Sequence, residues 1–156
     1  MDKVLSVKDN IEYRSHVEVM RLFGKEMNCH QLATWNPKGV KDWLVWMPII
    51  PRSEVNTNTS GVTWLNRFEL GGLYIREYAV SDATDEYLNS NTPKADPNAL
   101  RLVFAKEKKN NSTYRFKGVY VLDSSRTKEG NHYFRRIAES VLLKGEPVTE
   151  AIPLST

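Results

Sequence analysis

The chain has 156 residues, of which 40% are hydrophobic and 26% are charged, and its formal net charge is +3. These values predict one globular domain. The sequence contains no apolar run of about 18 residues, which excludes a membrane-spanning helix. The N-terminus has no apolar secretion segment and Cys29 is the only cysteine, so no internal disulfide or multi-cysteine zinc site forms and a cytoplasmic location is expected.

The first predicted element is an amphipathic helix over residues 14–27. Ser15 and Glu18 have the spacing of a capping box, in which each satisfies a free N–H group of the other. Apolar residues then recur every three or four positions, the period of a helix with one buried face. This stripe consists of Tyr13, Val17, Met20, Phe23 and Met27. Gly24 is expected to weaken the helix without ending it.

The rest of the chain is predicted to form short strands separated by polar loops. Strands are expected at residues 43–47, 62–65 and 73–78, which are rich in β-branched and aromatic residues. Polar loops are expected at residues 52–61 and 81–97.

A hairpin of residues 100–105 and 114–122 is the clearest pairing, with the polar connection 108–113 as its turn. Strict alternation in its second strand puts Tyr114, Phe116, Gly118, Tyr120 and Leu122 on one face. Residues 132–143 suit a helix or a strand, and a strand starting near Tyr133 is favoured.

One N-terminal amphipathic helix with five or six strands predicts an α+β fold built on a small twisted, partly open β-barrel. Residues 1–145 are expected to form a single domain. Residues 146–156, which contain two prolines, are expected to be a flexible tail.

Charge is segregated along the sequence. Residues 101–136 hold ten Lys or Arg against three acids, a net +7, whereas residues 69–100 hold six acids against two bases, a net −4. A basic hairpin on a nearly neutral body favours a polyanionic partner, and DNA is preferred over RNA. Solvated edge lysines would give the same pattern without a ligand. The predicted contacts to a nucleic-acid backbone are Lys106, Lys108, Lys109, Arg115, Lys117, Arg135 and Arg136.

Four tryptophans fall within thirty positions: Trp35, Trp43, Trp46 and Trp64. Trp43 and Trp46 are three residues apart, so on a strand they point to opposite faces, and one can be core while the other lines a pocket. Trp and Tyr side chains can stack on a base that has been flipped out of a duplex.

Catalytic motifs are weak. Cys29 and His30 are sequence neighbours, which seldom form a nucleophilic dyad, and no His/Cys spacing suits a metal. No phosphate-binding glycine loop and no serine elbow occurs. The sequence therefore predicts a binding module that is not itself an enzyme and needs no cofactor.

Residues 101–104 (RLVF), 114–122 (YRFKGVYVL) and 133–137 (YFRRI) are similar to a strand pattern of the PUA-like domains attached to bacterial restriction enzymes. That group includes the SRA, EVE and YTH-type readers of modified bases, and the similarity covers residues 40–143. It implies an aromatic pocket for a flipped, methylated base in a restriction or defence context. The pocket residues it suggests here are Trp43, Trp46, Trp64 and Tyr74, with Asn66 or Asp42 reading a base edge. No nuclease or helicase segment is recognised, so cleavage is assigned to another domain or subunit.

Two other function classes stay open. The acidic residues 69–100 suit a protein-interaction or inhibitory module, for example a phage-encoded antagonist. The third class is a small enzyme that acts on RNA or DNA, with His30 or His132 as acid or base alongside Tyr133 and Arg136. The sequence does not decide which base is read, the oligomeric state, or whether the chain is a whole protein.

Overall fold

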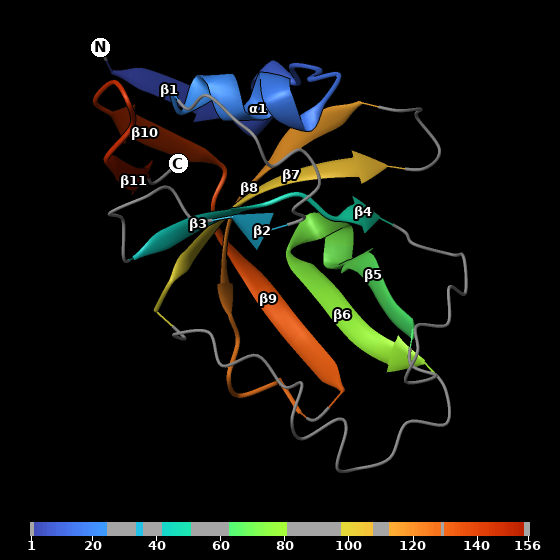
Figure 1. The fold of residues 1–156 in the computed structure, drawn as a ribbon. Helices are drawn as coiled ribbons and strands as arrows, with labels where there is room; N and C mark the ends of the chain where they lie inside the picture. The colour runs from blue at the N-terminus through green and yellow to red at the C-terminus, as the bar shows by residue number, and fades with distance from the viewer. Residues whose placement is uncertain are drawn as a thin grey trace.

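The structure is a computed structural model, and it describes residues 2–24, 34–35, 42–50, 63–80, 98–107, 113–128 and 130–154. It is built mainly of β-strands with one α-helix, α1 (Figure 1). None of the helices within those ranges is long and apolar enough to cross a membrane.

Most of the described strands belong to one large sheet, in the order β2-β3-β7-β8-β9-β6-β5, with β4 paired to β7. The strands are β2 (Thr34–Trp35), β3 (Trp43–Trp46), β4 (Ile49–Ile50), β5 (Thr63–Glu69), β6 (Tyr74–Val80), β7 (Leu100–Glu107), β8 (Tyr114–Leu122) and β9 (Asn131–Ala138). Strands β3 and β4 run parallel to β7, and the other neighbours are antiparallel.

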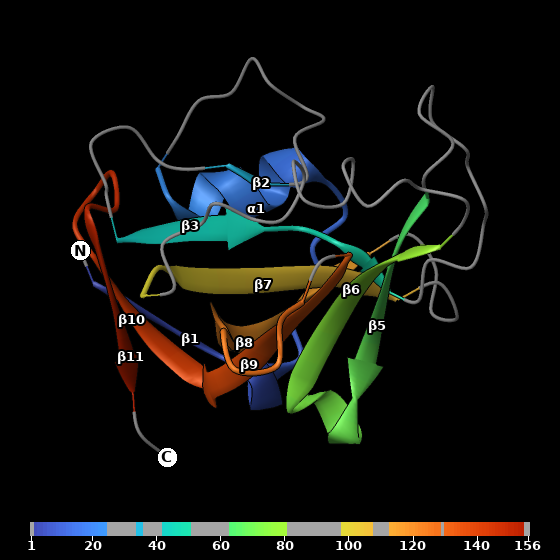
Figure 2. The same ribbon diagram turned by 90° about the horizontal axis from the view of Figure 1, so that it is seen from below.

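A second, smaller sheet joins segments from both ends of the chain. Its order is β1-β10-β11, formed by β1 (Lys3–Ser6), β10 (Ser140–Lys144) and β11 (Glu150–Leu154). In Figure 2 this small sheet and the β5–β6 pair lie at opposite ends of the molecule. The expectation of a flexible tail after residue 145 differs from the structure, because β11 pairs along its whole length with β10.

The large sheet is strongly curved. Strands β7 and β8 lie between β3 and β9, so three strand spacings, about 14 Å in a flat sheet, separate β3 from β9. The rings of Trp46 on β3 and Phe134 on β9 are nevertheless only 4.9 Å apart. Their shared face is therefore the concave one.

Of the predicted partly open barrel, the structure bears out a β-rich fold with one helix, but the sheet does not close into a barrel. Among the described strands, β5 pairs only with β6 and β2 pairs only with β3, so the two end strands leave the sheet open. Bulges at two positions of the β7–β8–β9 ladder bend the sheet without bringing its edges into register.

Each face of the large sheet carries its own core. The concave core consists of Trp46, Ile50, Ile75, Val103, Ala105, Tyr120 and Phe134. The convex core lies on the other face, under α1 (His16–Leu22) and beside the small sheet. There Phe23 packs on Trp43 and Phe104, with ring centroids 5.7 and 6.2 Å apart.

Helix α1 begins as predicted and ends earlier than predicted. The Ser15 side chain accepts a hydrogen bond from the Glu18 amide, as predicted. The Glu18 carboxylate differs from the prediction, because it accepts a bond from the Arg14 amide. The helix ends at Leu22, just before Gly24, whose φ of +70° is left-handed. Met27 lies outside the described residues.

The predicted hairpin is confirmed as β7 and β8, and residues 132–143 do form strands, β9 and β10. Alternation along β8 is interrupted, however. Tyr114 and Phe116 lie in the convex core, whereas Tyr120 lies in the concave core. The switch occurs at Gly118, where φ is +124° and the ladder register shifts on both sides. A bulge of this kind adds one residue and moves the following side chains to the other face.

Candidate functional site

Polar side chains gather on the concave face where β5, β6 and β9 adjoin. Asn66 pairs in register with Glu77, and Glu77 pairs with His132, so the three share one face of neighbouring strands. Ile75 lies two residues before Glu77 on β6, and Phe134 lies two residues after His132 on β9, so both are on the same face. Both belong to the concave core. The polar residues therefore continue the apolar concave core toward one end of the sheet.

Arg101 brings a positive charge to the same face. Its guanidinium lies 4.5 Å from the Phe134 ring centroid and 5.4 Å from the Trp46 ring centroid. Burial lowers the pKa of Arg101, and the opposite charge of Glu77 acts against that shift. A cation held over two rings and away from water has a stronger attraction to those rings than an exposed one. We call Trp46, Asn66, Glu77, Arg101 and His132 the concave cluster.

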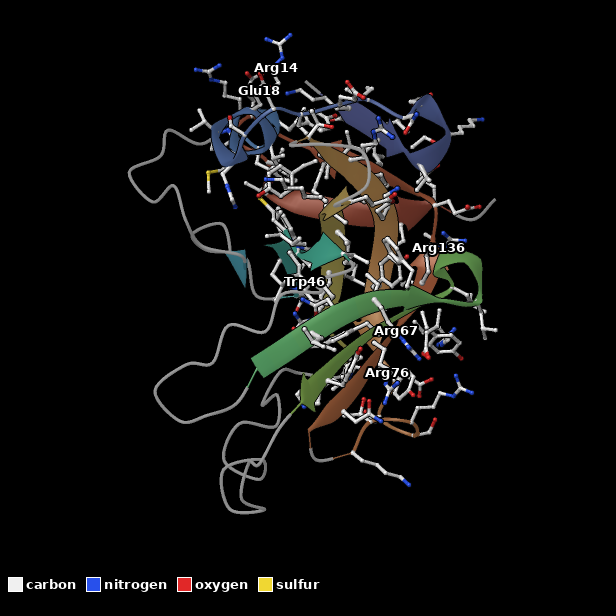
Figure 3. All side chains as sticks on the ribbon, turned by 90° about the vertical axis from the view of Figure 1, so that its right-hand side faces the viewer. Arg14, Glu18, Trp46, Arg67, Arg76 and Arg136 are labelled. Carbon is white, nitrogen blue, oxygen red and sulfur yellow. The ribbon has the colours of Figure 1, made fainter. Side chains whose placement is uncertain are left out.

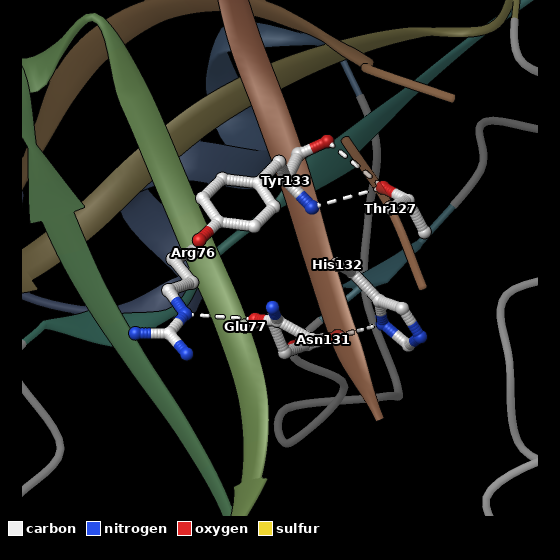
Figure 4. Close-up of polar contacts among 6 residues, drawn as sticks. All are labelled: Arg76, Glu77, Thr127, Asn131, His132 and Tyr133. Atoms are coloured by element: carbon white, nitrogen blue, oxygen red, sulfur yellow. Dashed lines mark hydrogen bonds and ion pairs between the residues drawn. The ribbon is translucent and has the colours of Figure 1, made fainter. Parts of the chain in front are cut away.

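Two features of the concave cluster leave hydrogen-bonding capacity for a ligand. The Asn66 Oδ1 atom is buried and, among the described residues, has no hydrogen-bond donor. The Glu77 carboxylate lies 3.5 Å from His132 Nδ1, and its side chain keeps 25% exposure, whereas that of His132 keeps 2%. Figure 4 shows the Glu77–His132 contact across the two strands. A buried acceptor without a donor is costly unless another group supplies the bond.

The concave cluster has the chemistry needed to hold a planar heterocycle. Trp46, which is buried and packs on Phe134, provides the aromatic floor of the cluster. Glu77 and Asn66 Oδ1 provide acceptors, and the guanidinium of Arg101 provides donors. Recognition of a flipped base needs stacking on aromatic groups and hydrogen bonds along one edge of the base. The arrangement therefore suits a base with an exocyclic amino group and a ring carbonyl.

The structure brings together only part of the predicted pocket. Trp43 and Trp46 face opposite sides of β3 as predicted, and Trp43 packs in the convex core. Trp64 is on β5 in register with Ala79, while its side chain lies outside the described residues. Tyr74 is on the opposite face of β6 from Glu77, and Asp42 is exposed just before β3. Of the six residues, Trp46 and Asn66 belong to the concave cluster.

The predicted backbone contacts are dispersed, and several are neutralised. Ion pairs join Arg115 to Glu12, Lys117 to Glu107, and Arg136 to Glu139. Arg135 is exposed on the face opposite to that of Arg136, as expected for strand neighbours. Lys106 is half-buried in β7. Burial of His16 lowers the pKa of that histidine, and the charge of Lys106 adds to the shift. Lys108 and Lys109 lie outside the described residues.

Sequence reasoning missed Arg101, Glu77 and Phe134 as site residues. Arg101 was counted with the solvated basic residues, yet it lies two residues before Val103 of the concave core and so is on the same face of β7. Glu77 was counted with the acidic block, yet it continues the alternation begun by Ile75. A charged residue in phase with the apolar residues of a strand was the available indication for both.

Comparison with known proteins agrees with this geometry. A family model described as the SET and RING associated (SRA) domain matches residues 1–143. Among solved structures, the chain is similar to "The 5-Hydroxymethylcytosine-Specific Restriction Enzyme AbaSI", with a TM-score of 0.66 and 22% identity over 97% of this chain. The chain spans 44% of the length of that protein, and the likeness shows a shared fold. No curated protein matches the chain.

Proposed function

Because the chain belongs to the SET and RING associated family, we propose that it binds DNA and recognises a modified base that has been flipped out of the duplex. The observation that carries this proposal is the concave cluster. There the buried Asn66 Oδ1 atom, which has no donor among the described residues, lies beside a carboxylate, a guanidinium and aromatic rings. Family membership gives the context of a modified-base reader, and the cluster supplies a site for the base.

The roles within the site follow from hydrogen-bonding capacity. A cytosine ring carries an exocyclic amino group as donor and a carbonyl and a ring nitrogen as acceptors. The amino group would donate to Asn66 Oδ1 and the Glu77 carboxylate, and the carbonyl would accept from Arg101. Trp46 and Phe134 would close the far side of the site. The 5-position then remains for a substituent, and the similar solved protein is named for 5-hydroxymethylcytosine.

Strand cleavage is assigned to another domain or subunit, in a restriction context. The similar restriction enzyme is more than twice as long as this chain, which leaves room in that protein for a second domain. The described residues supply recognition groups, and we place the reader function in them. DNA is preferred over RNA because the family and the similar solved protein belong to a restriction context, whose substrate is DNA.

The test is equilibrium binding of short duplexes that carry one cytosine, 5-methylcytosine or 5-hydroxymethylcytosine, measured by intrinsic tryptophan fluorescence at two salt concentrations. We expect one modified duplex to bind about tenfold more tightly than the unmodified one, a difference of about 1.4 kcal/mol. We also expect all affinities to fall as salt rises, because phosphate contacts release counterions.

Two variants and a control separate base reading from backbone attraction. Glu77→Gln removes the charge of one acceptor and Asn66→Ala removes the other acceptor. Both groups hold the amino group that all three cytosines share, so each variant is expected to prevent insertion of the base and thereby to abolish the preference for the modified duplex. The control is Arg14→Ala, because Arg14 is an exposed cation just before the N-terminus of α1. This variant should keep the preference for the modified duplex. A preference that survives both cluster variants, or no preference for any modification, would count against the proposal.

A further inference from the structure

The convex face of β5, β6 and β9 carries alternating guanidinium groups and aromatic rings. Arg76 lies 4.4 Å from the Tyr78 ring centroid and 5.8 Å from that of Tyr133. Arg126 lies 4.6 Å from the Tyr74 centroid and 5.6 Å from that of Tyr133. We call this array the Arg–Tyr ladder, and its members are Arg67, Tyr74, Arg76, Tyr78, Arg126 and Tyr133.

Hydrogen bonds hold the ladder in place. The Arg76 Nε atom donates to Asn131 Oδ1 at 2.7 Å, and the Tyr133 amide donates to Thr127 Oγ1 at 3.0 Å (Figure 4). The turn that presents Arg126 is fixed by Asp123, whose carboxylate accepts bonds from the Ser125 amide and hydroxyl. The cations and rings are therefore arranged before any ligand arrives, which lowers the entropic cost of binding.

A cavity of about 750 Å³ opens beside the ladder, within the size range of small-molecule sites. Its lining contains three cations, Arg67, Arg126 and Lys128, against one carboxylate, Glu69. Glu69 is paired with Arg67 at 3.0 Å. In the described part of the chain, neither Arg126 nor Lys128 forms an ion pair, and both are exposed. Within the described ranges, the cavity thus keeps two positive charges that form no ion pair with an acid.

We infer that this cavity is a second ligand site, which takes a nucleotide unit: a phosphate held by Arg126 and Lys128, with its base against Tyr133. Guanidinium groups match phosphate oxygens, and tyrosine rings and guanidinium planes both stack on bases. The unit is either a free nucleotide or one residue of a single strand, since both present the same groups.

The second site does not depend on the proposed base reading. Tyr133 and Arg76 alternate with His132 and Glu77 along the same two strands, so the two sites lie on opposite faces of the sheet. Figure 4 shows the Tyr133 ring on one side of β9 and the His132 ring on the other. A ligand in the cavity and a base at the concave cluster therefore do not compete for the same groups.

The experiment is a titration of the whole chain, monitored by NMR amide shifts, with thymidine 5′-monophosphate, thymidine, inorganic phosphate and an eight-residue oligothymidylate. We expect the monophosphate to bind more tightly than thymidine or phosphate alone, with shifts in β5, β6, β9 and residues 123–128. Tighter binding of the oligomer identifies a strand site, and equal or weaker binding identifies a free-nucleotide site. Either result supports the inference.

The variant Arg126→Ala/Lys128→Ala is expected to weaken monophosphate binding about tenfold or more. Its matched control is Lys8→Ala/Arg14→Ala, which removes two exposed cations far from the ladder, as the position of Arg14 in Figure 3 shows. The variant Arg126→Ala/Lys128→Ala should still prefer the same modified duplex as the unmutated chain, which separates this inference from the proposed function. The inference would be overturned by an equal loss of monophosphate affinity in Arg126→Ala/Lys128→Ala and in its control. It would also be overturned if phosphate bound as tightly as the nucleotide, or if the monophosphate did not bind.

Discussion

The two faces of the β6–β9 strand pair contain similar groups in different surroundings. On the concave face the Arg101 guanidinium lies 4.5 Å from the Phe134 ring, and on the convex face the Arg76 guanidinium lies 4.4 Å from the Tyr78 ring. Phe134 is 1% exposed, whereas Tyr78 is partly exposed. The geometry is nearly the same, so the difference in burial should decide what each contact contributes.

The largest expected effect is on the concave face. Arg101→Ala removes the cation over two buried rings and a positive charge that attracts the Glu77 carboxylate. We expect a loss of about 3 kcal/mol in the free energy of unfolding. Urea denaturation measures it. A loss below about 1 kcal/mol would mean that burial adds little to this contact.

Titration of Tyr120 probes the same core by pH. Burial raises the pKa of Tyr120 to about 12, and Arg136 acts against this shift. The folded state thus favours the neutral phenol, so its contribution is complete below pH 10 and is lost as pH rises from 10 to about 12. The loss is about 2 kcal/mol. Tyr120→Phe should flatten that part of the stability–pH curve, and an unchanged slope would contradict the assignment to Tyr120.

Asn66 separates stability from recognition. Asn66→Leu replaces a buried acceptor without a donor by an apolar side chain of similar size. We expect the free energy of unfolding to rise by about 1 kcal/mol while the preference for a modified base disappears. Thermal unfolding and duplex binding, measured on one preparation, test both parts. Lower stability would show that the Asn66 side chain is satisfied in solution.

The smallest effect is expected on the convex face. Arg76→Ala removes a guanidinium from Tyr78 and a hydrogen bond from Asn131. Because the contact is partly exposed, we expect a loss of about 0.5–1 kcal/mol. Comparison with Arg101→Ala in the same denaturation series is the measurement. Equal losses at the two positions would abolish the contrast between the faces.

The local elements were accessible from sequence because each rests on a short-range pattern. The capping box at Ser15, the opposite orientations of Trp43 and Trp46, and the β7–β8 hairpin all follow from spacing within a few residues. The early end of α1 at Gly24 is also local, yet the apolar stripe continued past it and concealed it.

The site was only partly accessible because it depends on strand order. Asn66, Glu77 and His132 come together through the order β5-β6-β9, which joins segments more than fifty residues apart. The bulge at Gly118 moves Tyr120 to the concave face, and strict alternation could not reveal that change. Charge counting placed Arg101 at the surface, although its side chain lies over buried rings.

The small sheet has a consequence for folding kinetics. Strand β1 pairs with β10 in the register Lys3 with Leu143, so nearly the whole chain lies between the two partners. Pairings of such high contact order form slowly, because the loop-closure entropy is paid before any contact is gained. During synthesis β1 must wait for β10 to leave the ribosome. A nascent chain that stops before residue 140 should therefore expose Leu5 and the adjoining edge of the convex core, and pulse proteolysis of stalled chains would detect it.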